Sequence, residues 1–423
     1  FTGHPFDMNN IYTDSQIILN GGIPTSDVAN VPMFYYTLVP ISYLYNAISS
    51  FFGIYPISFG VLPPALKSIA SWTIPQGAPV LYVTDWLYNL ILKIPFIVSD
   101  FVGGAILYVM VYRKYGERLA IISFTLWFLN PMLIWVSSVW GMWDSLAATF
   151  TLISIFLLLR NNLGFSALCL AIATGFKDYP LILAIPMLIY VYRTGNPRRL
   201  VLPIGIFVVA TLLIFSPFLS QAVYHNYGIL NPHGGNPAQD PSLTYGLTYW
   251  SVAPLTPISG TLVTSSSLLS LIILGLIVSA FAILKLRANQ ESLFFWELAF
   301  LCIFFLSYPR INEQWFVWLL PFLILLAKKP VQWSLVLCLS IVALVYSLVN
   351  AMFVSFFIPM YPYLQEGLVN AARSVMFLSY YRLFAMASLG IFFSLLLVIS
   401  LVSVYRTVTI GAERETTLSV VQK

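Results

Sequence analysis

Long apolar runs separated by short polar turns dominate the chain from residue 87 onward. The runs lack the alternation of apolar and polar residues that marks a half-buried strand. In a lipid bilayer a backbone satisfies all its N–H and C=O groups only in helices or closed barrels, so we predict that each run is a helix. The pattern gives about eleven membrane segments, at residues 87–112, 119–139, 143–159, 163–176, 179–192, 200–219, 262–284, 293–308, 315–327, 333–357 and 383–405.

Two of these runs are unusually short. Residues 163–176 and 179–192 form stretches of 14 residues each, whereas a membrane span takes roughly 20. They are either short tilted helices beside a thinned region or a re-entrant hairpin that enters from the cytoplasm. In both cases Lys177, between the two runs, is expected near the outer interface or deeper, facing protein or water.

The first 86 residues follow a different pattern, in which turn-forming residues interrupt an aromatic-rich stretch at residues 34–62. Pro40 and Pro56 lie within this stretch, and tyrosines like those it contains favour the membrane–water interface. We predict interfacial helices in a long outer loop, with a spanning hairpin as the alternative. The expected organisation is an outer first loop at residues 1–86, a transmembrane helical domain at residues 87–405 and a cytoplasmic tail at residues 406–423.

The composition supports an all-α polytopic membrane protein. Hydrophobic residues make up 59% of the chain and charged residues only 8%, whereas soluble domains have about 25% charged residues. The net charge is +5, but no run of Lys and Arg exceeds two residues, so cytoplasmic anchoring charge explains the excess and nucleic acid is not an expected partner. The chain begins at Phe1 without a Met or a signal-like segment, so we expect a first membrane helix upstream of it.

Charge is distributed unevenly between alternate turns. Cytoplasmic loops of membrane proteins carry an excess of Lys and Arg. When the basic turns are assigned to the cytoplasm by this rule, consecutive turns alternate between the two sides of the membrane along the whole series of runs. The cytoplasmic set is Arg113, Lys114, Arg118, Arg160, Arg193, Arg198, Arg199, Lys285, Arg287, Lys328, Lys329, Arg406, Arg414 and Lys423. Most acids and all three histidines then fall on or near the other side. We therefore expect function at the outer face.

Several charged residues at or inside the membrane segments are candidates for chemistry, because such residues are costly there. Asp144 begins a helix, where a carboxylate also serves as a plain cap of the helix dipole. Lys177 precedes Asp178 at the next outer turn, and a cation there suits a phosphate. Lys93 and Asp100 lie seven residues apart on one helix face, which fits a polar seam, a structural pair or a lysine that reaches the interface.

Two more candidates, Arg310 and Glu313, lie in an outer turn between two apolar runs. A salt bridge between them is the simpler alternative to a functional role. The chain contains no Asp-x-Asp, no metal-spaced histidine pair, no phosphate-binding glycine loop and no Gly-x-Ser-x-Gly. The residues alone thus predict an outer polar site with cations and carboxylates, but no particular reaction.

Four segments in a fixed order resemble a known family. They are LILKIPFIVSD at residues 90–100, NPMLIWVSSVWGMWD at 130–144, GFKDYPL at 175–181 and NEQWFVWLLP at 312–321. Together with the opening at residues 3–27, this series resembles the membrane-embedded C-type (GT-C) glycosyltransferases. Within them it is similar to enzymes that use a polyprenyl-phosphate or dolichyl-phosphate sugar, including archaeal and bacterial members and the catalytic subunit of the GPI mannosyltransferase.

The resemblance implies a GT-C-like fold and an inverting hexosyltransferase. Such an enzyme moves mannose or glucose from the lipid-linked donor to a hydroxyl of a glycan, protein or lipid acceptor at the extracytoplasmic face. It implies a multi-pass protein of the cell membrane, or of the ER membrane in a eukaryote, and leaves an accessory subunit open. No resident cofactor is expected.

The resemblance also implies roles for single residues. Asp7 fits the family's acid in the first outer loop, which acts as the base, and Asp14 is a second candidate. Lys177 and Arg310 would contact the donor phosphate. Asp144, Asp178 and Glu313 would shape the sugar and acceptor pocket. Several family members carry paired acids where Asp7 stands alone, so dependence on a divalent metal stays open, and Met142 replaces a frequent glutamine.

Two functions from other classes remain as alternatives. A transporter or lipid flippase would place its key charges near the middle of the bilayer and expose them alternately to both faces. Only Lys93, Asp100 and Lys177 suit that role. A scaffold without activity is the third alternative.

Overall fold

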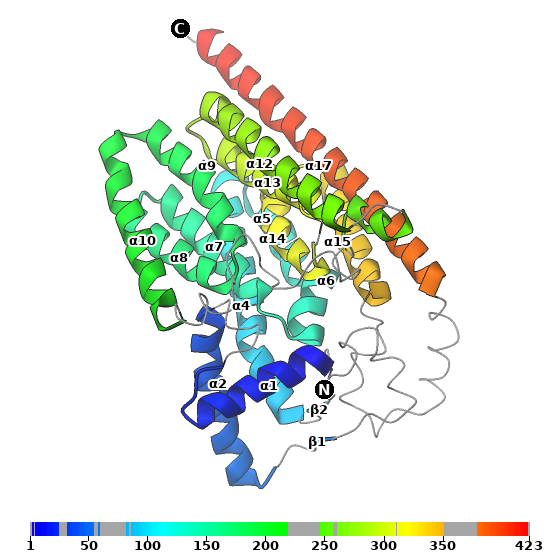
Figure 1. Ribbon diagram of the computed structural model, residues 1–423. Coiled ribbons are helices and arrows are strands. Elements are labelled where there is room, and N and C mark those ends of the chain that lie inside the picture. Colours follow the sequence, from blue (N-terminus) through cyan, green and yellow to red (C-terminus); the bar gives the residue numbers. More distant parts are fainter. Residues whose placement is uncertain are drawn as a thin grey trace.

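The computed structural model describes residues 2–3, 5–24, 32–54, 58–59, 82–83, 86–218, 246–256, 260–309, 311–350 and 379–421 (Figure 1). Helices make up nearly all the regular structure of these residues. The exception is a two-residue antiparallel pairing of β1 (Ser58–Phe59) with β2 (Tyr82–Val83). The predicted all-α class is confirmed.

Nearly every described residue of the eleven apolar runs lies in helix; the exceptions are Leu129, Asn130, Trp143, Tyr308 and Ala327. The helices that contain the runs are α4 (Trp86–Tyr115), α5 (Glu117–Phe128), α6 (Pro131–Ile134), η2 (Trp135–Trp140), α7 (Asp144–Leu159), α8 (Leu163–Phe176), α9 (Tyr179–Thr194), α10 (Val201–Phe215), α12 (Gly260–Lys285), α13 (Gln290–Ser307), α14 (Phe316–Leu326), α15 (Pro330–Asn350) and α17 (Ser379–Val421). Short 3-10 turns join some of them: η3 (Pro197–Leu200), η4 (Ser216–Phe218), η6 (Tyr249–Leu255) and η7 (Glu313–Trp315). Among the described residues, 6 helices are long and apolar enough to cross a membrane. The figure of about eleven membrane segments stays a prediction.

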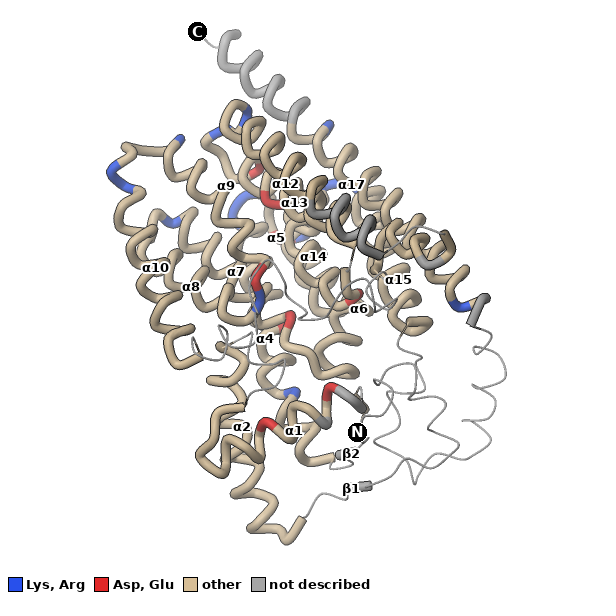
Figure 2. Tube along the Cα trace, viewed as in Figure 1, with Lys and Arg blue, Asp and Glu red and all other residues tan. Residues whose placement is uncertain are grey.

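The predicted basic turns meet at one end of the helical bundle. Glu291, at the start of α13, lies 2.8 Å from Lys114 Nζ of α4 and 2.7 Å from Lys328 Nζ after α14. Arg199 donates a hydrogen bond to Asn161, which joins the turn after α9 to the turn after α7. Figure 2 shows the basic residues gathered at the upper ends of these helices. We call this end, formed by the ends of α4, α7, α9, α12 and α14, the basic end.

The first two helices lie at the opposite end of the bundle (Figure 1). In α1 (Pro5–Leu19), the Ser15 hydroxyl lies 2.7 Å from the Tyr88 hydroxyl of α4. In α2 (Pro32–Phe52), the ring of Phe34 stacks on Trp143 with centroids 4.0 Å apart. α2 is not among the candidate membrane spans. Its predicted position at the interface stays a prediction.

The segment between α5 and α7 contains a helix break at Asn130 and a π-helix, η2. Asn130 ends the α5 run, and its side chain accepts hydrogen bonds from the backbone N–H of Met132 and Leu133, while Pro131 occupies the first helical position. Both residues favour a helix start. The Asn130 side chain accepts from backbone N–H groups that have no partner within the helix, and Pro131 has no N–H that would need one. The chain then forms the π-helix η2, an element that often marks functional sites.

Candidate functional site

The five-residue turn from Trp140 to Asp144 connects η2 to α7 and carries contacts from distant parts of the chain. Trp140 Nε1 donates a 2.7 Å hydrogen bond to Asp7 Oδ2 in the first turn of α1. Trp143 Nε1 donates a 3.2 Å hydrogen bond to the carbonyl of Phe176 at the end of α8. This turn, which we call the WGMWD turn, therefore holds α1 and α8 against the start of α7.

Gly141 gives the WGMWD turn its shape. Its φ of +89° lies in the left-handed region, which a residue with a Cβ enters only at a cost. A Cβ at this position would also lie 3.0 Å from Met8 Cε and 3.1 Å from Lys93 Cε. The turn thus needs glycine both for its backbone conformation and for the close approach of α1 and α4.

We expect Gly141→Ala to lower the free energy of unfolding by about 1–2 kcal/mol, the usual cost of a left-handed residue with a Cβ. It should also disturb the Trp140–Asp7 contact on one side of the turn. Thermal unfolding of the purified variant measures the first effect. Gly205→Ala in α10 is the matched control, because a Cβ there would meet nothing within 4 Å; an equal loss in both variants would contradict this account.

Asp144, at the other end of the turn, is fully buried and faces a cation. Its Oδ1 accepts a 2.9 Å hydrogen bond from Trp318 Nε1 of α14 and lies 3.7 Å from Lys177 Nζ. Its Oδ2 has no hydrogen-bond partner within the described part of the chain. The ammonium of Lys177 also lies 4.8 Å from the centre of the Trp143 ring, within cation–π range. The Lys177 side chain keeps 14% of its surface exposed, so a ligand can reach it.

An aromatic stack extends from this charge pair. The ring of Tyr179 lies on that of Trp318, with centroids 4.3 Å apart and 13° between the planes. Trp318 in turn stacks on Trp315 at 4.6 Å, and Tyr308 lies 6.0 Å beyond Trp315. Since Trp318 also donates to Asp144, the stack fixes α14 and the start of α9 around the carboxylate. Flat apolar faces beside convergent polar groups are typical of small-molecule sites.

The structure brings some predicted site residues together and separates others. Asp7 and the Asp144–Lys177 pair both contact or belong to the WGMWD turn. The four steps along the chain from Trp140 to Asp144 keep the Cα atoms of these two residues within about 14 Å. Asp178 lies next to Lys177 but is exposed. Asp14 is 1% exposed and lies deeper along α1.

Glu313, a further predicted site residue, begins η7, just before α14. Glu313 is buried, and both its carboxylate oxygens accept 3.2 Å hydrogen bonds from Asn350 Nδ2 of α15. Arg382 of α17 donates to the side chain and the carbonyl of Asn350. Arg310 lies outside the described residues, so its expected contacts with a donor phosphate and with Glu313 stay predictions.

Two charged residues of α4, Lys93 and Asp100, form hydrogen bonds within the protein. Lys93 Nζ donates to the carbonyls of Thr2 and of Val139 in η2. Asp100 Oδ1 accepts a 3.1 Å hydrogen bond from Ser137 Oγ, also in η2. Within the described chain, neither residue forms an ion pair with the other. Both therefore fasten α4 to the π-helix, which favours the structural interpretation.

Sequence reasoning missed the partners that make this site. Trp140 and Trp318 were not singled out, although they lie in the motifs that carry the family resemblance. Glu297 was also missed; it is fully buried in α13, and neither carboxylate oxygen has a hydrogen-bond partner in the described residues. An acid inside an apolar run was the available signal. The described residues contain no group of three or more His, Cys, Asp or Glu that could hold a metal ion.

Comparison with known proteins places the chain beside one group of membrane enzymes. No family model matches it. It is 30% identical over 151 residues to GPI mannosyltransferase 1 of Saccharomyces cerevisiae, which covers 32% of this chain and 37% of that protein. It is 33% identical over 124 residues to GPI mannosyltransferase 1 of Eremothecium gossypii, a match that covers 29% of this chain and 30% of that protein. It is 31% identical over 108 residues to GPI mannosyltransferase 1 of Candida albicans, a match that covers 25% of this chain and 27% of that protein.

Over these segments the chain is similar to the GPI mannosyltransferases. The resemblance inferred from its motifs is thus confirmed. The matches span only about a third of the length of these curated relatives, from 27% to 37%. The activity, substrates and partners of this chain are therefore proposals.

Proposed function

We propose that this protein is an integral-membrane hexosyltransferase that moves mannose or glucose from a polyprenyl-phosphate donor to an acceptor hydroxyl, with inversion, at the extracytoplasmic face. One observation carries the proposal: an acid on α1 and a buried acid–lysine pair meet on the WGMWD turn. This arrangement occurs in a chain that is similar over part of its length to the GPI mannosyltransferases. Asp144 begins α7 and Lys177 precedes α9, at the ends of these two helices that lie away from the basic end, which supports the proposal of an outer site.

Asp7 acts as the general base in this proposal. A sugar hydroxyl is a poor nucleophile at neutral pH, and a positioned carboxylate that takes its proton supplies roughly a 100- to 10,000-fold acceleration. The Trp140 indole holds one oxygen of Asp7 by its 2.7 Å hydrogen bond. This contact orients the carboxylate for the acceptor.

Lys177 stabilises the leaving group. As the bond between the anomeric carbon and the phosphate oxygen breaks, the polyprenyl phosphate gains negative charge. A fixed ammonium beside that oxygen therefore lowers the energy of the transition state more than that of the bound donor. The phosphate leaves without protonation, so the reaction needs no acid partner to Asp7. Arg310 is the proposed second phosphate contact.

The buried acids and the aromatic stack position the sugar. Asp144 has a free carboxylate oxygen within the described residues, which suits a sugar hydroxyl donor. Trp318, which stacks on Tyr179 and Trp315 and donates to the other oxygen of this carboxylate, holds the acid in place. Glu313, Asp178 and Asp14 are the proposed further contacts to the sugar or the acceptor.

A transporter or flippase is disfavoured by the contacts of Lys93 and Asp100, which bond to backbone carbonyls and to Ser137. Groups that carry a substrate across the bilayer must exchange their partners during the cycle. Here both groups hold α4 against η2.

The deciding experiment separates transfer from transport. The purified chain in liposomes is given a polyprenyl-phosphate hexose labelled in the sugar, with the total lipid extract of the host membrane as acceptor source. We expect label to leave the donor and to appear in a product only when both the protein and the acceptor are present. Movement of intact donor between leaflets without cleavage would replace this proposal with the transporter.

A further inference from the structure

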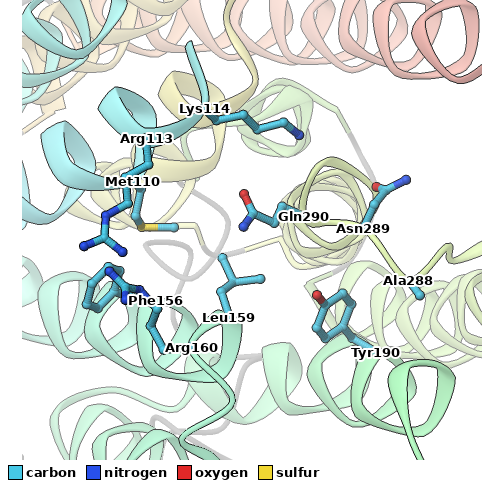
Figure 3. Close-up of a pocket in the computed structure, with 10 residues that line it drawn as sticks. All are labelled: Met110, Arg113, Lys114, Phe156, Leu159, Arg160, Tyr190, Ala288, Asn289 and Gln290. Atoms are coloured by element: carbon cyan, nitrogen blue, oxygen red, sulfur yellow. The ribbon is translucent and has the colours of Figure 1, made fainter. Parts of the chain in front are cut away.

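A cavity of about 610 Å³ lies at the basic end, away from the WGMWD turn. It opens between α4, α7, α9 and the turn that joins α12 to α13 (Figure 3). Its lining residues are Met110, Arg113, Lys114, Phe156, Leu159, Arg160, Tyr190, Ala288, Asn289 and Gln290. None of these residues is Asp, Glu or His, so they include no carboxylate or imidazole base for sugar transfer.

Two guanidinium groups meet at this cavity. Arg113 Cζ lies 6.0 Å and Arg160 Cζ 5.2 Å from the centre of the Phe156 ring. Figure 3 shows both head groups converging beside that ring. Stacking on an aromatic face holds a guanidinium in place and leaves its N–H edges free to bind an anion.

Neither arginine has an acidic partner in the part of the chain that the structure describes. Lys114, which also lines the cavity, differs because Glu291 lies 2.8 Å from its ammonium. The same carboxylate lies 2.7 Å from Lys328, so its charge is already shared between two lysines. Arg113 and Arg160 therefore leave two positive charges at the same Phe156 ring, and an anion that contacts both would offset their repulsion.

The rest of the lining indicates which anion fits. Gln290 and Tyr190 line the cavity across from the arginines (Figure 3), and their amide and hydroxyl are groups that can donate to phosphate oxygens. Met110, Leu159 and Phe156 supply an apolar wall next to these donors. A ligand with a phosphate and an adjoining apolar chain matches both parts. The cavity also lies where helices end, at the basic end.

We propose that this cavity binds the phosphate of an anionic phospholipid through Arg113 and Arg160. Arginine matches phosphate geometry with paired hydrogen bonds, and basic pockets between membrane helices recognise anionic head groups in this way. The bound lipid joins α4, α7 and α9, which otherwise meet there around an open cavity. It thereby stabilises the basic end without taking part in sugar transfer.

The test uses the full chain in phosphatidylcholine nanodiscs, with phosphatidylglycerol added stepwise. Bound lipid is counted by native mass spectrometry and unfolding is followed by Tm. We expect phosphatidylglycerol to be retained in preference to phosphatidylcholine and to raise Tm by about 2–5 °C, because a ligand of the folded state stabilises it. Arg113→Gln/Arg160→Gln should weaken retention about 10- to 100-fold, the usual loss for charged hydrogen bonds.

A matched control removes two positive charges elsewhere at the same end. Arg118→Gln/Arg198→Gln changes exposed residues that do not line the cavity, and it should retain lipid like the wild type. Arg160→Lys keeps the charge but cannot form the paired hydrogen bonds to phosphate, so its loss of lipid retention should lie between those of the wild type and the double variant. This single variant also tests the site if the double variant fails to fold. Equal losses in both double variants would overturn the site in favour of general basic attraction. Equal binding of inorganic phosphate, or no preference for the anionic lipid, would overturn the lipid assignment.

Discussion

Replacing Asp7 by Asn is expected to lower sugar transfer by about 100- to 10,000-fold, while the chain still inserts and folds. The amide keeps the size of the carboxylate and an oxygen that can accept the hydrogen bond from Trp140 Nε1. It cannot take a proton from the acceptor hydroxyl. The loss should therefore appear in kcat at a saturating donor concentration, with little change in Tm. The measurement is the release of label from a polyprenyl-phosphate hexose in the presence of acceptor lipid.

Two further variants assign this effect to a single carboxylate. Glu117→Gln makes the same change at an exposed position at the start of α5, on the basic end, and should leave the rate unchanged. Asp14→Asn tests the second candidate base, which is 1% exposed and lies on the same helix as Asp7. A normal rate in Asp7→Asn together with a lost rate in Asp14→Asn would move the base to Asp14. Normal rates in both would remove the α1 acids from the mechanism.

The helices were predictable because a membrane leaves the backbone few options. Each apolar run had to satisfy its own hydrogen bonds, so the run itself indicated the element. The shared end of the basic turns also followed from the alternation of charge, and contacts such as Lys114–Glu291–Lys328 are its local result. Both features depend on residue type and spacing along the chain, which the sequence displays directly.

The partners in the site were not predictable in the same way, because they depend on contacts between distant residues. Trp140 meets Asp7 across 133 positions, and Trp318 meets Asp144 across 174. The π-helix that ends at Trp140 has the same apolar composition as an α-helix, so the pattern of residues does not reveal its wider turn. The motif residues Lys177 and Asp144 were identified as charges at two outer turns. Their 3.7 Å approach is a property of how α7, α8 and α14 pack.

The second large effect is expected at Lys177, which has two separable roles. Lys177→Met removes the cation 3.7 Å from the fully buried Asp144 carboxylate. Breaking a buried pair from one side typically costs about 3–5 kcal/mol, because the remaining charge is left uncompensated. The same change removes the proposed stabilisation of the leaving phosphate, for which a loss of about 100- to 1,000-fold in rate is typical. Thermal unfolding and the labelled-donor assay measure the two losses independently.

The double variant Lys177→Met/Asp144→Leu distinguishes these roles. With the buried carboxylate also removed, no uncompensated charge remains, so much of the lost stability should return. Asp144→Leu alone provides the reference, because it removes the acid but keeps the lysine 4.8 Å from the Trp143 ring. If Lys177 contacts the donor phosphate, the double variant regains Tm yet transfers sugar far more slowly than Asp144→Leu. If Lys177 serves only to balance Asp144, the two variants transfer at the same rate, since the lysine then has nothing left to neutralise.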